Sequence, residues 1–150
     1  MQFKQAGLSG LIRYAFYNSA KAVMPIHNLH HKPFDEGTRD KLELYREYLR
    51  KWLPVFINVP SVDVIQVFDF FAGPGFDVEG HQGSPAITCE EIREAMVKNG
   101  RKRSIIKAYF NEKNSEKYKN LSSYIGEQKV YLPEVTFATL KNGFQSAFEK

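Results

Sequence analysis

The chain has 150 residues, a length that favours one domain and allows an ordinary hydrophobic core. Hydrophobic residues make up 43% and charged residues 25%, which is typical of a folded protein and excludes disorder throughout the chain. The net charge of +4 is mildly basic and suits enzymes and nucleic-acid-binding proteins equally. The single cysteine, Cys89, excludes an internal disulfide and a cysteine zinc site, and it favours a cytoplasmic location. No apolar run approaches the roughly 18 residues of a membrane span, so we expect no membrane insertion.

The first predicted element is an amphipathic helix over residues 8–23, which Pro25 ends. Its polar face is poor in Lys and Arg, so we expect it to pack against the core or a partner rather than a membrane. Residues 26–37 have the pattern of a loop. Three histidines in this loop lack the carboxylate or cysteine that would complete a ligand set, so we predict no metal site: His27, His30 and His31.

A second helix is predicted to begin near Thr38, a favourable N-cap, and to stop at Pro54. Its apolar stripe consists of Leu42, Tyr45, Leu49, Trp52 and Leu53.

The run 64–70 is mostly apolar and predicts a strand buried on both faces. A glycine-rich turn follows at 72–83, and Ser84 and Pro85 then predict the N-cap and first turn of a helix that ends at Asn99-Gly100. Its expected inner face consists of Ile87, Ile92, Ala95 and Met96.

Residues 105–110 predict a second strand, and Ser115 is expected to cap a helix that Gly126 closes. The inner face of that helix would be Tyr118, Leu121 and Ile125, and a third strand is predicted over 135–140. The alternation of strands and helices predicts an α/β fold with a parallel sheet and right-handed crossovers.

The end of the first strand carries the residues of chemical interest. Ligands of parallel sheets lie beyond the carboxyl ends of the strands, and Gly73 and Gly75 permit a close approach of the backbone to a ligand. A dinucleotide fingerprint would need a third glycine where Val78 stands, and no Gly-Lys-Ser/Thr follows, so neither phosphate-binding signature is met. What remains is an acidic residue followed at +2, +4 and +6 by Phe71, Gly73 and Gly75, with the acid at Asp69.

This spacing is that of the first motif of S-adenosylmethionine (SAM)-dependent methyltransferases. The string Phe-Ala-Gly-Pro-Gly resembles the Phe-x-Gly-x-Gly motif of DNA cytosine and adenine methyltransferases. The longer string at 69–85 is more similar to the three-Cys-motif partner family, as are residues 32–38 and 110–112. The resemblance spans about residues 32–148.

The resemblance implies a Rossmann-like class I methyltransferase fold with three αβα layers, of which this chain would hold the N-terminal part. It would occupy residues 38–150, after an N-terminal helix and loop at 1–37. The family is named for a partner protein that carries three cysteines, and such a protein is the implied partner. The methyl acceptor is open, with nucleic acid favoured by analogy alone.

The resemblance also implies roles for individual residues. The backbone of the turn would line the methionine part of SAM, Asp69 would hold its ammonium group, and Glu112 would accept the ribose hydroxyls. Asn142 stands where related proteins carry an acid that contacts the adenine amino group. The residues of this proposed cofactor site are Asp69, Phe71, Ala72, Gly73, Pro74, Gly75, Glu112 and Asn142. The alternative is purely structural, with Asp69 capping the turn and Glu112 forming a surface ion pair.

The resemblance further implies a fourth strand with an Asp-Pro type catalytic segment, which these 150 residues do not contain. We therefore expect a fragment or a degenerate remnant, and whether the chain is an enzyme stays open. An unpaired sheet edge would favour oligomers. A different class of function is a non-catalytic interaction module that binds protein or nucleic acid through the helix at 8–23 and the basic residues at 101–107.

Overall fold

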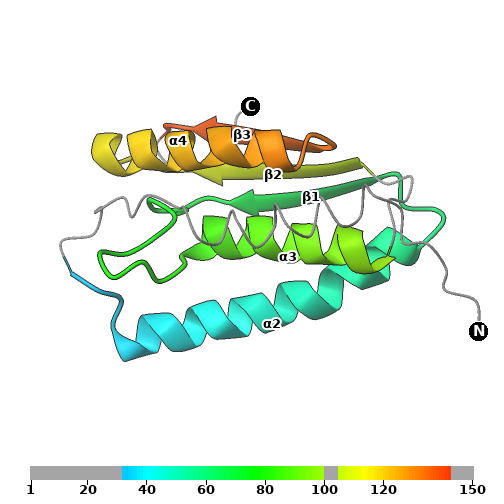
Figure 1. The fold of residues 1–150 in the computed structure, drawn as a ribbon, viewed down its shortest axis with the longest axis horizontal. Helices are drawn as coiled ribbons and strands as arrows, with labels where there is room; N and C mark the ends of the chain where they lie inside the picture. Colours follow the sequence, from blue (N-terminus) through cyan, green and yellow to red (C-terminus); the bar gives the residue numbers. More distant parts are fainter. Residues whose placement is uncertain (1–31, 100–104, 143–150) are drawn as a thin grey trace, which may run out of the picture.

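The computed structural model describes residues 32–99 and 105–142. These ranges contain three helices and three strands (Figure 1). In chain order they are α2 (Glu36–Asn58), β1 (Val64–Asp69), α3 (Ser84–Asn99), β2 (Ile105–Asn111), α4 (Ser115–Tyr131) and β3 (Val135–Leu140). Three predicted features lie outside the described ranges: the helix at 8–23, the histidines of the loop that follows it, and the basic residues at 101–104.

The three strands form one parallel sheet in the order β1-β2-β3. Val67 of β1 pairs with Ala108 of β2, which in turn pairs with Phe137 of β3. The α/β fold and the parallel sheet are therefore confirmed. Because the strands are parallel, their carboxyl ends meet at one edge, where the motif residues lie.

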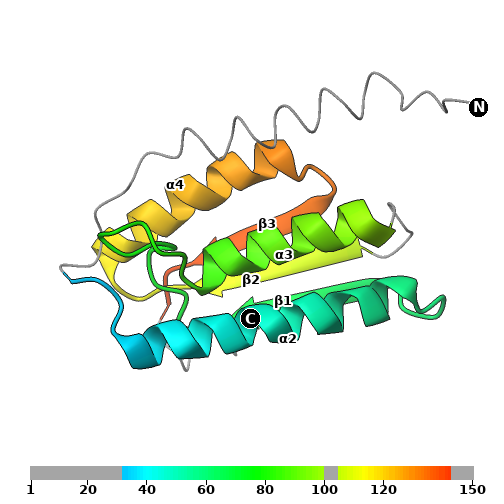
Figure 2. The same ribbon diagram turned by 60° about the horizontal axis from the view of Figure 1, so that its bottom comes forward.

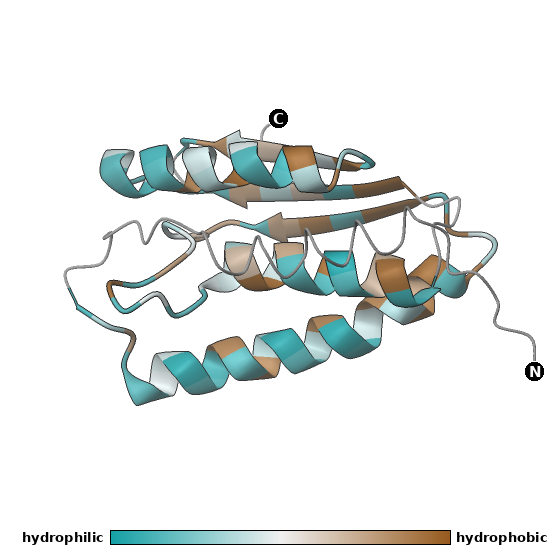
Figure 3. Cartoon of the chain, in the orientation of Figure 1, coloured by the Kyte–Doolittle hydropathy of each residue, from teal (hydrophilic) through white to brown (hydrophobic). Residues whose placement is uncertain are grey.

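Within the described ranges, helices cover one face of the sheet. Figure 2 shows α2, α3 and α4 side by side over that face. The strand residues that point toward them are buried and apolar: Ile65, Val67, Ile106, Ala108, Phe110, Val135 and Phe137. Figure 3 shows the hydrophobic stretches of the strands in brown.

The opposite face of the sheet is exposed. Val64 is 41% exposed, Phe68 52% and Ile105 50%. The prediction that the first strand is buried on both faces was therefore wrong for this part of the chain. Side chains alternate between the two faces of a strand, and the helices of the described residues cover only one of these faces.

Helix α2 differs from the sequence prediction at both ends. Its N-cap is Asp35, whose carboxylate accepts the Thr38 N–H at 2.7 Å. Pro54 does not end the helix, which continues to Asn58. A proline inside a helix costs about 3 kcal/mol. Burying the neighbours Leu53 and Ile57 contributes about 1.5–3 kcal/mol each, which is enough to carry the helix past it.

Helix α4 also continues past its predicted end. Asn114 is the N-cap and accepts the N–H groups of Glu116 and Lys117. Gly126 lies inside the helix. The helix continues past it because residues beyond it are buried in the core: Gln128 is fully buried and Leu132 is nearly so. An interior glycine costs only about 1 kcal/mol.

The predicted inner faces are confirmed. In α2 the stripe is buried at Leu49 and Leu53 or packed against the core, and in α3 and α4 most of the named residues are buried. At the start of α3, Ser84 is the first helical residue rather than the N-cap, and its hydroxyl donates to Asp69.

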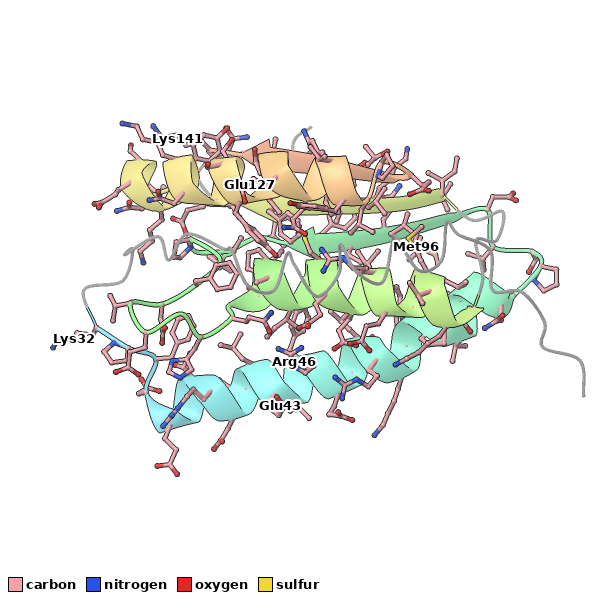
Figure 4. All side chains as sticks on the ribbon, in the orientation of Figure 1. Lys32, Glu43, Arg46, Met96, Glu127 and Lys141 are labelled. Atoms are coloured by element: carbon pink, nitrogen blue, oxygen red, sulfur yellow. The ribbon has the colours of Figure 1, made fainter. Side chains whose placement is uncertain are left out.

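Helices α2 and α3 meet through buried charge as well as apolar contacts. The Glu91 side chain is 1% exposed and lies 3.3 Å from Arg46 Nη1 and 3.0 Å from Arg50 Nη2. Figure 4 labels Arg46 between the two helices. Arg46 also pairs with Glu90 at 2.8 Å and donates to Gln82 in the loop before α3. These contacts fix α2 against α3.

Among the described residues, no helix combines the length and apolarity that crossing a bilayer requires.

Replacing Arg46 by Met should lower the free energy of unfolding by about 2–4 kcal/mol, because it leaves the buried Glu91 carboxylate short of a partner. The matched control is Lys51→Met. Lys51 is 81% exposed and 3.9 Å from Glu47, so its loss should change stability by less than about 0.5 kcal/mol. Urea unfolding measures both, and equal effects would contradict a structural role for the Glu91 cluster.

The exposed sheet face should drive self-association, because it carries the exposed Phe68, which stacks on Tyr109, and further along the strands the exposed pair Val64 and Ile105. Phe68→Lys should shift the chain toward monomer in size-exclusion chromatography with light scattering. Ser123→Lys adds the same charge on exposed α4 and should not. A wild-type chain that is monomeric throughout would contradict this prediction.

Candidate functional site

The turn after β1 depends on glycine. Gly73 has φ 65° and Gly75 φ 101°, both in the region that other residues rarely adopt. Gly83 is needed for a different reason: its N–H donates to Gly75 O at 2.7 Å, and a Cβ there would lie 3.1 Å from the same oxygen. The two ends of the loop therefore touch, and the glycines allow the tight turn that this contact requires.

Asp69 stabilises this turn through two hydrogen bonds. Its carboxylate accepts the Ser84 hydroxyl at 2.5 Å and the Phe71 N–H at 3.1 Å. Burial raises the pKa of Asp69, which outweighs these two hydrogen bonds, and the nearby charge of Glu112 adds to the rise. Asp69 therefore links the end of β1 to the first turn of α3.

Asn111, which the sequence analysis did not single out, joins the three strand ends. It is 4% exposed, and its Nδ2 donates to Phe70 O at 3.1 Å and to Asn142 O at 3.2 Å. Its Oδ1 accepts the Asn142 N–H, and its backbone carbonyl accepts the Ala72 N–H. A polar residue at the end of an apolar strand was the signal available in the sequence.

Glu112 follows directly after β2. Its N–H donates to Leu140 O at 2.9 Å, which continues the sheet by one residue, and its Oε1 accepts the Asn114 N–H at 2.7 Å. Within the described ranges, Oε2 has no hydrogen-bond partner. The carboxylate is thus oriented by the backbone and keeps one oxygen for a ligand.

A cleft of about 370 Å³ lies at this edge of the sheet. Its size is within the range of small-molecule sites. The turn and Glu112 both line it, as do the start of α3, a lysine of α4 and the beginning of α2. The lining residues are Phe34, Thr38, Leu42, Phe71, Ala72, Gly73, Pro74, Gly75, Gly83, Ser84, Glu112 and Lys117.

The structure therefore brings six of the eight proposed cofactor-site residues into one cleft. Asp69 and Asn142 do not line it: Asp69 lies behind the turn, and Asn142 is held by Asn111. The wall from α2 was not predicted from the sequence; it consists of Thr38 and Leu42 in α2 and of Phe34 just before the helix. This wall comes from 30 or more residues before the turn, and no local pattern connects the two segments.

A buried carboxylate fastens that wall to the loop. Asp77 is fully buried and accepts the N–H groups of Phe34 at 2.8 Å, Glu79 at 2.9 Å and His81 at 2.8 Å. It also bonds His81 Nδ1 at 2.8 Å. Burial opposes ionisation of Asp77, but these four hydrogen bonds outweigh it and lower its pKa. Asp77 thus stays charged and ties the start of α2 to the glycine-rich loop.

Within the described part of the chain, no group of three or more His, Cys, Asp or Glu side chains is placed to hold a metal ion. Comparisons with known protein families, with curated proteins and with solved structures gave no match.

The two carboxylates should affect stability with opposite pH dependence. The stability that Asp69 contributes is fully present below pH 3.8 and is lost as pH rises through its raised pKa. Asp77 has a lowered pKa, so its contribution is present above pH 3.8 and is lost as pH falls through the folded value.

Asp69→Asn should therefore gain stability relative to wild type as pH rises above 3.8. Asp77→Asn should instead lose about 1–3 kcal/mol at neutral pH, because it weakens the hydrogen bonds that the buried Asp77 side chain accepts from three backbone N–H groups. Urea unfolding above and below pH 3.8 measures both variants. The same sign of pH dependence in the two would contradict the assignment.

Proposed function

We propose that this domain binds S-adenosylmethionine in the cleft, as the cofactor-binding half of a methyltransferase-like protein similar to the three-Cys-motif partner family. The observation that carries the proposal is that the glycine turn and Glu112 line the same cleft. A glycine-rich turn beside an oriented carboxylate suits a ligand that combines an extended chain with a ribose.

The residues present fit this ligand. Glu112 would accept both ribose hydroxyls, and charge-assisted hydrogen bonds of this kind contribute about 1.5–3 kcal/mol each. The turn at 72–75 would support the methionine part, because Gly73 and Gly75 allow its tight backbone conformation and Pro74 fixes the chain without a donor.

The proposed roles of Asp69 and Asn142 become indirect. Both carboxylate oxygens of Asp69 already accept hydrogen bonds, so we assign it to positioning the turn, with its charge acting on the ammonium group at a distance or through water. Asn142 is anchored by Asn111 beside β3, and its contact with adenine stays a prediction.

When bound, SAM would supply an electrophilic methyl group. The described residues bind and orient the cofactor, and none of them is assigned to the acceptor. A nucleic-acid acceptor and a three-cysteine partner protein rest on the resemblance of the 69–85 string alone.

A second candidate function is an interaction module. The exposed apolar face of the sheet, with Val64, Phe68 and Ile105, favours binding of a protein partner. This function would use the face away from the helices, so it is compatible with ligand binding in the cleft.

Isothermal titration calorimetry with SAM tests the first proposal. Glu112→Gln should weaken binding by about tenfold or more, since it replaces a charged acceptor by a neutral one. Glu116→Gln is the matched control, because Glu116 is exposed in the first turn of α4 and does not line the cleft. Absence of any wild-type binding at millimolar SAM would reject the proposal.

A further inference from the structure

Phe34 stands out among the residues that line the cleft. It precedes α2, yet its N–H is tied to Asp77, 43 residues later in the chain. The tip of its ring lies against the end of the glycine loop, since a Cβ on Gly83 would be 3.7 Å from Phe34 Cζ. Phe34 therefore lines the cleft beside the turn that would support the ligand, with its ring tip at Gly83.

The charges around the cleft are unevenly distributed. Its charged side chains, Glu112 and Lys117, come from β2 and α4, whereas the wall from α2 offers the ring of Phe34, the hydroxyl of Thr38 and the aliphatic Leu42. A ligand whose ribose is held by Glu112 would extend its 5′ substituent over the glycine turn toward Phe34. In SAM that substituent is a sulfonium, which carries a full positive charge.

We propose that Phe34 determines specificity by binding the sulfonium through a cation–π contact, so that the cleft prefers SAM over the neutral thioether S-adenosylhomocysteine. The inference rests on the proposed function. The face of an aromatic ring attracts a cation, and the attraction grows when water is excluded. Asp77 is the positioning residue, because it holds the Phe34 backbone in place without facing the ligand.

The test is titration calorimetry of the 150-residue chain with each of the two ligands. Phe34→Leu should weaken SAM binding on the order of fivefold and leave S-adenosylhomocysteine binding nearly unchanged. Phe34→Tyr keeps the ring and should keep the wild-type preference. Leu42→Ala, in the same wall, should weaken both ligands in the same proportion because it removes only apolar contact.

Asp77→Asn provides a second measurement. It keeps the ring but loosens its attachment, so the preference for SAM should fall in the same direction as in Phe34→Leu. If Phe34→Leu does not fold, as judged by circular dichroism, Phe34→Met replaces it as a ring-free variant of closer length.

The outcomes separate this inference from the proposed function. If the wild-type chain binds neither ligand, the proposed function fails. If it binds both, and the ratio of the two dissociation constants is the same in wild type and the ring-free variant, the function stands and the role of Phe34 is overturned.

Discussion

The cleft depends on one buried carboxylate. Asp77 has no exposed surface, and a charge removed from water is tolerated only when hydrogen-bond donors surround it. Its donors come from two places: the glycine-rich loop, and the backbone of Phe34 just before α2. The need to satisfy this charge therefore brings the α2 wall and the loop together. Without Asp77, the hydrogen bond that holds Phe34 in the wall facing the turn would be lost.

Contacts between α2 and α3 also hold the α2 wall in place. Glu91 on α3 is buried between two arginines of α2, and Tyr45 bonds Thr88 across the same interface at 2.8 Å. Buried ion pairs of this kind add little net stability but penalise any other alignment of the helices. They fix α2 at the register in which Thr38 and Leu42 reach the cleft. At the strand ends, Asn111 does the same for the sheet by holding Phe70 and Asn142.

The sequence predicted the elements better than their ends. β3 was predicted with the bounds that the structure has, and the helical apolar stripes were correct except at Tyr118 of α4, because both follow from local periodicity. Pro54 and Gly126 were taken as helix ends and lie inside helices instead. Local propensity disfavours helix at both positions, but the burial of Ile57 and Gln128 beyond them could not be known before the core was assembled. The burial of β1 on both faces was wrong for a related reason, since hydrophobicity alone does not show which face receives the helices.

By itself, the sequence determined that a glycine turn and a carboxylate would follow two neighbouring strands. A parallel sheet places successive strand ends at one edge, so Gly73, Gly75 and Glu112 meet without further information. Only the tertiary structure decided what faces them. Phe34 and Asp77 are far apart in the chain and carry no shared pattern. Their contact exists because a buried charge must find its donors wherever the packed helices bring them.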